Sequence, residues 1–242
     1  MILSLDLMIL GFVTLIYVTF ILSISIKMIA KYIELNQKLF LYVGLSTIGL
    51  ATAWSGVAFN FISVIFFDVK PSMELYFLLH GVYIPFSSFF WLVSCLYLLG
   101  VKPTIRRWIS IIAGLLSVIF TCLYLIIIFT DTTILGTPIN EIQINYAIFS
   151  ELYLLGALIV MTVLGFSISI KTLKLKERRV KLKGRLLFFG QVLFVFAALL
   201  EIVTPSIIFI ILARFLVMVC AILFYGGFIL PKWMENLFIR RK

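Results

Sequence analysis

Seven long apolar runs constrain the fold of this chain more than any other feature. They cover about residues 2–26, 39–67, 75–100, 108–130, 146–170, 186–203 and 207–230. Each run can cross roughly 30 Å of hydrocarbon, because a helix rises about 1.5 Å per residue. We therefore predict an all-α, polytopic membrane protein, a bundle of seven transmembrane helices.

The composition supports lipid as the solvent. The chain is 64% hydrophobic and 12% charged, whereas soluble domains are about 45–50% apolar and 25% charged. The spans use most of the 242 residues. We expect one transmembrane domain over residues 1–242, multi-pass in the cell (plasma) membrane, with no soluble catalytic or nucleic-acid-binding domain.

The basic residues fall in alternate loops. All of the 20 lysines and arginines except Lys70 and Arg214 lie in the first, third and fifth loops or the C-terminal tail. Basic loops mark the cytoplasmic side of a membrane protein. The predicted orientation is N-terminus out and C-terminus in.

Short matches between the two halves indicate a 3+1+3 parallel repeat, with the fourth helix as the connector. The sequence Ser-Ile-Ser-Ile-Lys at 23–27 recurs at 167–171. Pro71 and Pro205 precede the third and seventh spans, and His80 and Arg214 follow them by nine residues. Common origin of the halves and chance similarity in apolar sequence both fit these matches.

Several polar side chains fall inside the outer half of the predicted bundle. Ionisable groups are costly in a membrane, so each is a functional candidate. The ligand-binding candidates are Asn60, His80, Tyr83, Glu151, Glu201 and Arg214.

Glu201 and Arg214 stand on either side of Pro205, and helical rise places them close enough for an ion pair. That pair could simply pin helix six to helix seven. Alternatively, Arg214 binds an anionic group of a ligand.

His80 is the only histidine in the chain, so we predict no metal site. It is either a hydrogen-bonded packing residue or a proton or ligand contact beside Glu151 or Glu201. Pro85 is predicted to kink the third helix, as a hinge or as a static bend.

Small residues in the second helix follow small-xxx-small spacing, at Gly49/Ala53 and Ala51/Ser55. This spacing lets helices approach closely. It indicates tight packing within the bundle or a homodimer interface.

The segment 171–185 is dense in lysine and arginine, with Glu177 as its one acid. It is either a topology anchor or a contact for anionic lipid headgroups or an acidic cytoplasmic signalling partner. The residues predicted to make that contact are Lys174, Lys176, Arg178, Arg179, Lys181 and Lys183.

No enzyme motif is present, so we predict no catalytic activity. Residues 207–230 contain no lysine, which excludes a retinal Schiff base of the microbial rhodopsin kind, and we predict no cofactor.

The stretch Tyr225-Gly-Gly-Phe-Ile-Leu-Pro-Lys-Trp-Met234, followed by a basic tail, resembles the end of the last helix in the N-terminal seven-transmembrane sensor module of prokaryotic (archaeal and bacterial) histidine kinases and related signalling proteins. The resemblance implies an input module, here without an output domain because the sequence stops at Lys242. No site residue transfers with it.

We therefore expect a stand-alone sensor or receptor-like protein that detects a small molecule or membrane condition from outside and signals to a cytoplasmic partner. A small-solute transporter of two three-helix bundles and a ligand-free scaffold are the alternatives. The inner half offers few polar residues beyond Gln191, which favours the sensor over the transporter.

Overall fold

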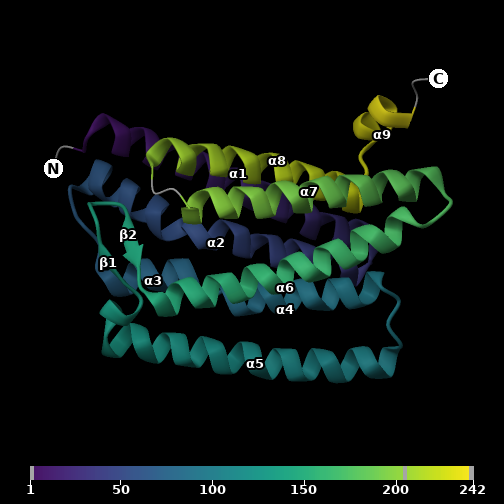
Figure 1. Cartoon of the computed structure of the whole chain (residues 1–242), viewed down its shortest axis with the longest axis horizontal. Coiled ribbons are helices and arrows are strands. Elements are labelled where there is room, and N and C mark those ends of the chain that lie inside the picture. Colours follow the sequence, from purple (N-terminus) through teal and green to yellow (C-terminus); the bar gives the residue numbers. More distant parts are fainter. Residues whose placement is uncertain (1–2, 204–205, 240–242) are drawn as a thin grey trace.

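The computed structural model describes residues 3–203 and 206–239, and most of them are helical. The helices are α1 (Leu5–Leu35), α2 (Lys38–Phe67), α3 (Met73–Gly81), α4 (Ile84–Leu98), α5 (Pro103–Thr130), α6 (Ile148–Leu173), α7 (Arg178–Val203), α8 (Ile207–Ile229) and α9 (Lys232–Ile239). A short 3-10 turn, η1 (Thr132–Ile134), and two strands, β1 (Gly136–Pro138) and β2 (Ile144–Tyr146), join α5 to α6 (Figure 1).

Seven helices among the described residues are long and apolar enough to cross a membrane, counting α3 and α4 together as one. The chain is therefore an all-α, multi-pass membrane bundle, as predicted. Thr204 and Pro205, the predicted break between the sixth and seventh spans, lie outside the described residues. The orientation in the membrane stays a prediction.

Six of the spans form a closed ring. Going round it, α1 packs on α2, α2 on α3 and α4, α4 on α6, α6 on α7, α7 on α8, and α8 on α1. The contacts within α1–α4 match those within α6–α8, and the α1–α8 contact has its counterpart in α6–α4. This arrangement follows the predicted 3+1+3 plan.

Helix α5 lies outside the ring, at one edge of the bundle (Figure 1). It packs on α3, α4 and η1, and most of its apolar side chains are exposed. A helix that is apolar and exposed suits contact with lipid. Helix α5 therefore connects the two halves from outside the ring, with its exposed side chains available to lipid.

Several helices extend beyond the predicted apolar runs. Helix α1 continues past Lys27 and Lys31 to Leu35, and Asn36 caps it in a left-handed conformation (φ 50°). Asparagine tolerates this conformation and is a known helix stop. Most of the basic 171–185 segment is likewise helical, with residues 174–177 joining α6 to α7.

The third span is broken at Val82 and Tyr83, as the kink predicted at Pro85 requires. Proline lacks the N–H that would bond to the Gly81 carbonyl one turn earlier. The Tyr153 hydroxyl of α6 donates to that carbonyl instead, at 3.0 Å. Ser117 of α5 similarly donates to the Pro85 carbonyl at 3.1 Å. Side chains of neighbouring helices therefore satisfy the backbone at the break.

A β-hairpin that the sequence did not predict closes one end of the bundle. Strands β1 and β2 pair antiparallel, with Thr137 opposite Asn145. The fully buried Ile142 at the hairpin tip packs with residues of α1, α2 and α8, and Leu135 packs with residues of α2, α3 and α5. An ion pair between Lys70 and Glu141 (3.3 Å) fixes the tip to the α2–α3 connection. We call this the hairpin end, and the opposite end, with residues 174–177, the basic end.

The small residues of α2 pack inside the bundle. A Cβ atom at Gly49 would lie 2.0 Å from the Ser87 Oγ of α4, and one at Gly56 would lie 2.8 Å from the Tyr76 ring of α3. The predicted close packing is confirmed at Gly49. A homodimer remains a prediction.

Candidate functional site

A buried group of polar side chains lies toward the hairpin end, and Arg214 of α8 is at its centre. Arg214 is 2% exposed, so protein atoms cover it. Its Nη1 donates to the Leu10 carbonyl of α1 at 3.3 Å. Its charge also interacts with the side chains of Tyr17, Tyr76, Tyr146 and Glu201. We call these residues, together with Trp54 and His80, the polar cluster.

The predicted ion pair between Glu201 and Arg214 is not a direct contact. Among the described residues, nitrogen–oxygen pairs within 4.0 Å join Lys31 to Glu34, Lys70 to Glu141, and Arg179 to Glu235. Glu201 instead accepts a hydrogen bond from Trp54 Nε1 of α2 at 2.8 Å. The indole donor of the neighbouring helix takes the place that the sequence suggested for the guanidinium.

Trp54 also joins Glu201 to α1. Its ring meets Tyr17 edge-on, with centroids 5.1 Å apart, and the Tyr17 hydroxyl donates to the Leu50 carbonyl at 2.7 Å. These contacts link α1, α2 and α7, and the bond from Arg214 to Leu10 joins α8 to α1.

His80 is held by two tyrosines. It stacks on Tyr76, one turn earlier on α3, and on Tyr146 at the end of β2, with centroids 5.8 Å and 5.0 Å apart. The Tyr76 and Tyr146 hydroxyls lie 3.0 Å apart, and Tyr146 lies 3.4 Å from His80 Nδ1. The hairpin therefore places a side chain directly on the lone histidine.

Tyr146 is a neutral phenol at ordinary pH. Burial raises the pKa of its hydroxyl well above the usual value of 10.0, and the neighbouring Tyr76 raises it further. Loss of the proton would leave a buried charge, which is costly. Tyr146 can therefore act as a hydrogen-bond donor or acceptor at the cluster, but not as an anion that would neutralise Arg214.

Within residues 3–203 and 206–239, three buried polar atoms near this end have no hydrogen-bond partner: Asn60 Oδ1, His80 Nε2 and Arg214 Nε. The Ala53 carbonyl lies within reach of the His80 ring, but Nε2 has no partner in hydrogen-bond geometry. Asn60 adjoins Phe61, which packs on Gly11 beside Leu10. Unsatisfied buried groups are costly, so they mark places where a ligand or water would gain hydrogen bonds.

Two predicted site residues lie apart from the cluster. Glu151 is exposed in the first turn of α6, where the buried Ser150 occupies the inward face and donates to the Leu135 carbonyl at 2.8 Å. Glu151 therefore does not stand beside His80. Tyr83 lies at the α3–α4 break, and its hydroxyl donates to the Leu45 carbonyl at 3.1 Å.

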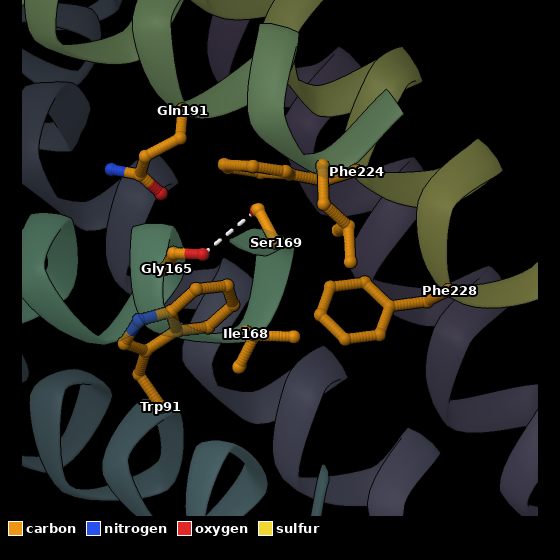
Figure 2. Close-up of a pocket in the computed structure, with 8 residues that line it drawn as sticks. Trp91, Gly165, Ile168, Ser169, Gln191, Phe224 and Phe228 are labelled. Atoms are coloured by element: carbon orange, nitrogen blue, oxygen red, sulfur yellow. Dashed lines mark hydrogen bonds between the residues drawn. The ribbon is translucent and has the colours of Figure 1, made fainter. Parts of the chain in front are cut away.

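The middle of the bundle is tightly packed around Gln191. Gln191 of α7 is 1% exposed, and the gap beside it is too narrow for a water molecule. Trp91, Phe224 and Phe228 close around this gap, and Ser169 is turned back to its own helix through a bond to the Gly165 carbonyl (Figure 2). These residues form core packing, and the gap between them does not admit water.

At the basic end, some of the residues predicted to contact lipid or a partner are exposed, and others are bonded within the protein. Lys174, Lys176, Arg178 and Lys181 are exposed, whereas Arg179 pairs with Glu235 of α9 at 2.7 Å. Lys183 turns to the bundle and donates to the Phe228 carbonyl at 3.0 Å. The exposed set remains free to meet an anionic surface.

Sequence reasoning missed the aromatic members of the cluster, namely Tyr17, Trp54, Tyr76 and Tyr146. The spacing of Tyr76 and His80, four residues apart, could have indicated that both lie on one face of a helix. Nothing local could have placed Tyr146, which follows a loop, or Trp54, whose partner Glu201 is 147 residues away.

Comparisons with known proteins assign no family. No protein-family model matches the chain, and no curated protein is significantly similar to it. Among the described residues, no group of three or more histidine, cysteine, aspartate or glutamate side chains could hold a metal ion. The resemblance to histidine-kinase sensor modules stays a prediction.

Proposed function

We propose that this chain is a seven-helix sensor of the plasma membrane, in which the polar cluster detects a small polar or anionic molecule that reaches it from the hairpin end. On the predicted orientation that end faces outward. The observation that carries the proposal is the contact of Tyr146 with His80 and Tyr76. It joins a surface hairpin to buried groups that lack hydrogen-bond partners.

The recognition chemistry follows from those groups. Arg214 supplies a cation, with its Nε unpartnered, and Asn60 and His80 supply further unpartnered atoms. Arg214 Nε is a donor and Asn60 Oδ1 an acceptor, so an anion would pair with Arg214, whereas a polar molecule that carries a donor would be needed to satisfy Asn60. Binding would require the hairpin to shift, because the cluster is buried beneath it.

The broken third span offers a route from the hairpin end to the basic end. His80 and Tyr76 lie on α3, just before the break at Val82 and Tyr83. Helix α4 then runs to the basic end, where Lys171 of α6 donates to the Leu99 carbonyl at 2.5 Å and Arg106 covers the Tyr97 ring at 3.7 Å. A change of angle at the break would move α4 against these contacts, where a cytoplasmic signalling partner would read it.

Spin labels at the basic end test this coupling. The three native cysteines, Cys95, Cys122 and Cys220, are replaced by alanine. Spin labels are then attached to the two cysteines introduced by Lys102→Cys and Lys176→Cys. Tyr146→Ala removes the ring that covers His80, whereas Tyr146→Phe keeps the ring and removes only the hydroxyl. Ile139→Ala, on the exposed hairpin tip (64% exposed), is the matched control.

The sensor proposal expects Tyr146→Ala to shift the Lys102–Lys176 distance distribution in reconstituted bilayers, and Ile139→Ala to leave it unchanged. Tyr146→Phe should give a smaller shift in the same direction. Superimposable distributions for all three variants would show that the two ends are not coupled and would refute the proposal.

A small-solute transporter is the second candidate, favoured by the matching contacts of the α1–α4 and α6–α8 triplets. Such two-bundle transporters move solute by alternating access. A cysteine replacing Asn60 or Gln191 would then react with membrane-impermeant thiol reagents from both sides. The sensor expects reaction only from the hairpin end at Asn60, and none at Gln191. Solute flux abolished by Arg214→Leu would decide for transport.

A ligand-free scaffold is the remaining alternative. It would gain support if Glu201→Gln combined with Arg214→Gln left both the stability and the coupling between the ends unchanged.

A further inference from the structure

A cleft of about 560 Å³ opens at the basic end, beside the α1–α2 connection and the α8–α9 connection. Its polar lining includes Lys31, Lys183 and Lys232. Its apolar lining includes Leu35, Phe40 and Phe228. This volume lies within the usual range of small-molecule sites.

The cleft lies at the depth of a membrane interface. Four candidate spans end at it: Leu5–Leu35, Lys38–Phe67, Arg178–Glu201 and Ile207–Ile229. Two apolar runs, 39–67 and 207–230, reach their limits at the lining residues Phe40 and Leu230. Because hydrocarbon gives way to headgroups about where an apolar run ends, a molecule in this cleft would have its polar part among headgroups. Leu35 is 49% exposed, so the apolar wall continues onto the outer surface of the bundle.

The charge of the cleft is positive. Lys31 pairs with Glu34 in the last turn of α1, and Lys183 donates to the Phe228 carbonyl near the end of α8. Lys232 makes no hydrogen bond or ion pair within the described part of the chain. The nearby carboxylate of Glu235 is held by Arg179 on α7 at 2.7 Å. The cleft lining therefore includes three lysines and, among the described residues, no acid, although Glu34 pairs with Lys31 and the charges of Glu177 and Glu235 act on Lys183.

We propose that this cleft binds one anionic glycerophospholipid from the leaflet at the basic end. The lysines would hold its phosphate, and an acyl chain would follow the wall of Leu35 and Phe40 toward the hydrocarbon. A free anion would use the lysines but not the apolar wall, whereas an amphiphile uses both. The site differs from the exposed lysines of the 174–177 connection, which lie outside the cleft.

The test titrates the purified full chain in neutral detergent with phosphatidylglycerol, phosphatidylcholine or inorganic phosphate. Native mass spectrometry counts bound lipid, and thermal unfolding follows stabilisation. The cleft variant is Lys31→Gln/Lys183→Gln/Lys232→Gln. The matched control, Lys102→Gln/Arg107→Gln/Arg185→Gln, removes the same charge from exposed positions at the same end.

We expect saturable binding of one phosphatidylglycerol, weakened about tenfold to a hundredfold in the cleft variant and less than about threefold in the control. Lys183 also caps α8, so the double variant Lys31→Gln/Lys232→Gln provides a version that keeps this bond. The double variant should also bind phosphatidylglycerol more weakly, by a smaller factor than the triple cleft variant.

Four results would overturn the proposal. Equal binding of phosphatidylcholine would remove the role of charge. An equal loss of affinity in the control variant would show a diffuse attraction between the basic end and anionic lipid, and no site. Unchanged affinity in the folded double variant would show that Lys31 and Lys232 do not hold the phosphate. Equal stabilisation by inorganic phosphate would reassign the cleft to a free anion.

Discussion

The hydroxyl of Tyr153 is expected to stabilise the break in the third span. Pro85 cannot donate a hydrogen bond to the Gly81 carbonyl, and Tyr153 of α6 supplies that bond at 3.0 Å. Tyr153→Phe removes the donor and keeps the ring, which stacks on Tyr124 with centroids 5.1 Å apart and an interplanar angle of 18°. The substitution therefore isolates one hydrogen bond.

The expected cost is about 1 kcal/mol. A buried carbonyl left without a partner costs about 1–3 kcal/mol in proteins generally. Side-chain hydrogen bonds inside membrane proteins contribute less, about 0.6 kcal/mol on average and about 1.7 at most. The side chain of Tyr153 is only partly buried, so a value near the middle of these ranges follows.

Unfolding of the purified protein by SDS in mixed micelles measures this cost. Tyr42→Phe is the control, because Tyr42 stacks on Phe90 and Tyr97 and its hydroxyl makes no hydrogen bond within the described residues. Tyr42→Phe should change the free energy of unfolding by less than about 0.5 kcal/mol, the usual limit for substitutions that remove no specific contact.

A double-mutant cycle with Pro85→Ala tests the reasoning itself. Alanine restores the N–H at position 85, so the Gly81 carbonyl regains a backbone donor and Tyr153→Phe should cost less in that background. An equal cost of Tyr153→Phe in both backgrounds would refute the claim that Tyr153 compensates for the proline.

The remaining predictions concern charge, packing and pH. Arg214→Met is expected to leave the free energy of unfolding unchanged or to raise it by about 1 kcal/mol, because the buried guanidinium lacks a direct ion pair; a loss above about 2 kcal/mol in SDS unfolding would contradict this. Gly49→Ala should cost about 1–3 kcal/mol, since its Cβ would lie 2.2 Å from Ser87 Cβ. Gly156→Ala, with nothing within 4 Å of the new atom, should instead stabilise by under about 1 kcal/mol, and equal effects would refute the packing argument. The Asp131 carboxylate accepts hydrogen bonds from the side chain and backbone of Thr133, which lower its pKa; this stabilisation is present above about pH 4 and is lost as pH falls through the lowered pKa, so the pH dependence of thermal unfolding should shrink in Asp131→Asn.

The sequence located the spans well because hydropathy is a local property. The seventh span was predicted at 207–230 and the structure has Ile207–Ile229. Helix ends were less well predicted wherever basic residues continue a helix beyond the apolar run, as in α1 and at the start of α7. A lysine ends a hydrophobic stretch but is a good helix former, so polarity and helicity end at different residues.

The burial of the candidate residues was predicted in part. Arg214, His80 and Asn60 are buried near the hairpin end, as intramembrane polar residues should be. Glu151 was assigned inward from depth alone, and the structure turns it outward. Successive helical residues differ by about 100°, so depth without rotation cannot place a side chain.

What the sequence determined by itself is the seven-span plan, the concentration of basic residues in alternate loops and the break at Pro85. These depend on composition over a window, or on the missing N–H of one residue. Only the tertiary structure decided that Glu201 meets Trp54, that Tyr146 covers His80 and that three lysines line one cleft. Helices that are apolar on most sides carry little amphipathic signal to show which face turns inward, so packing between distant segments sets their rotation and, with it, the site.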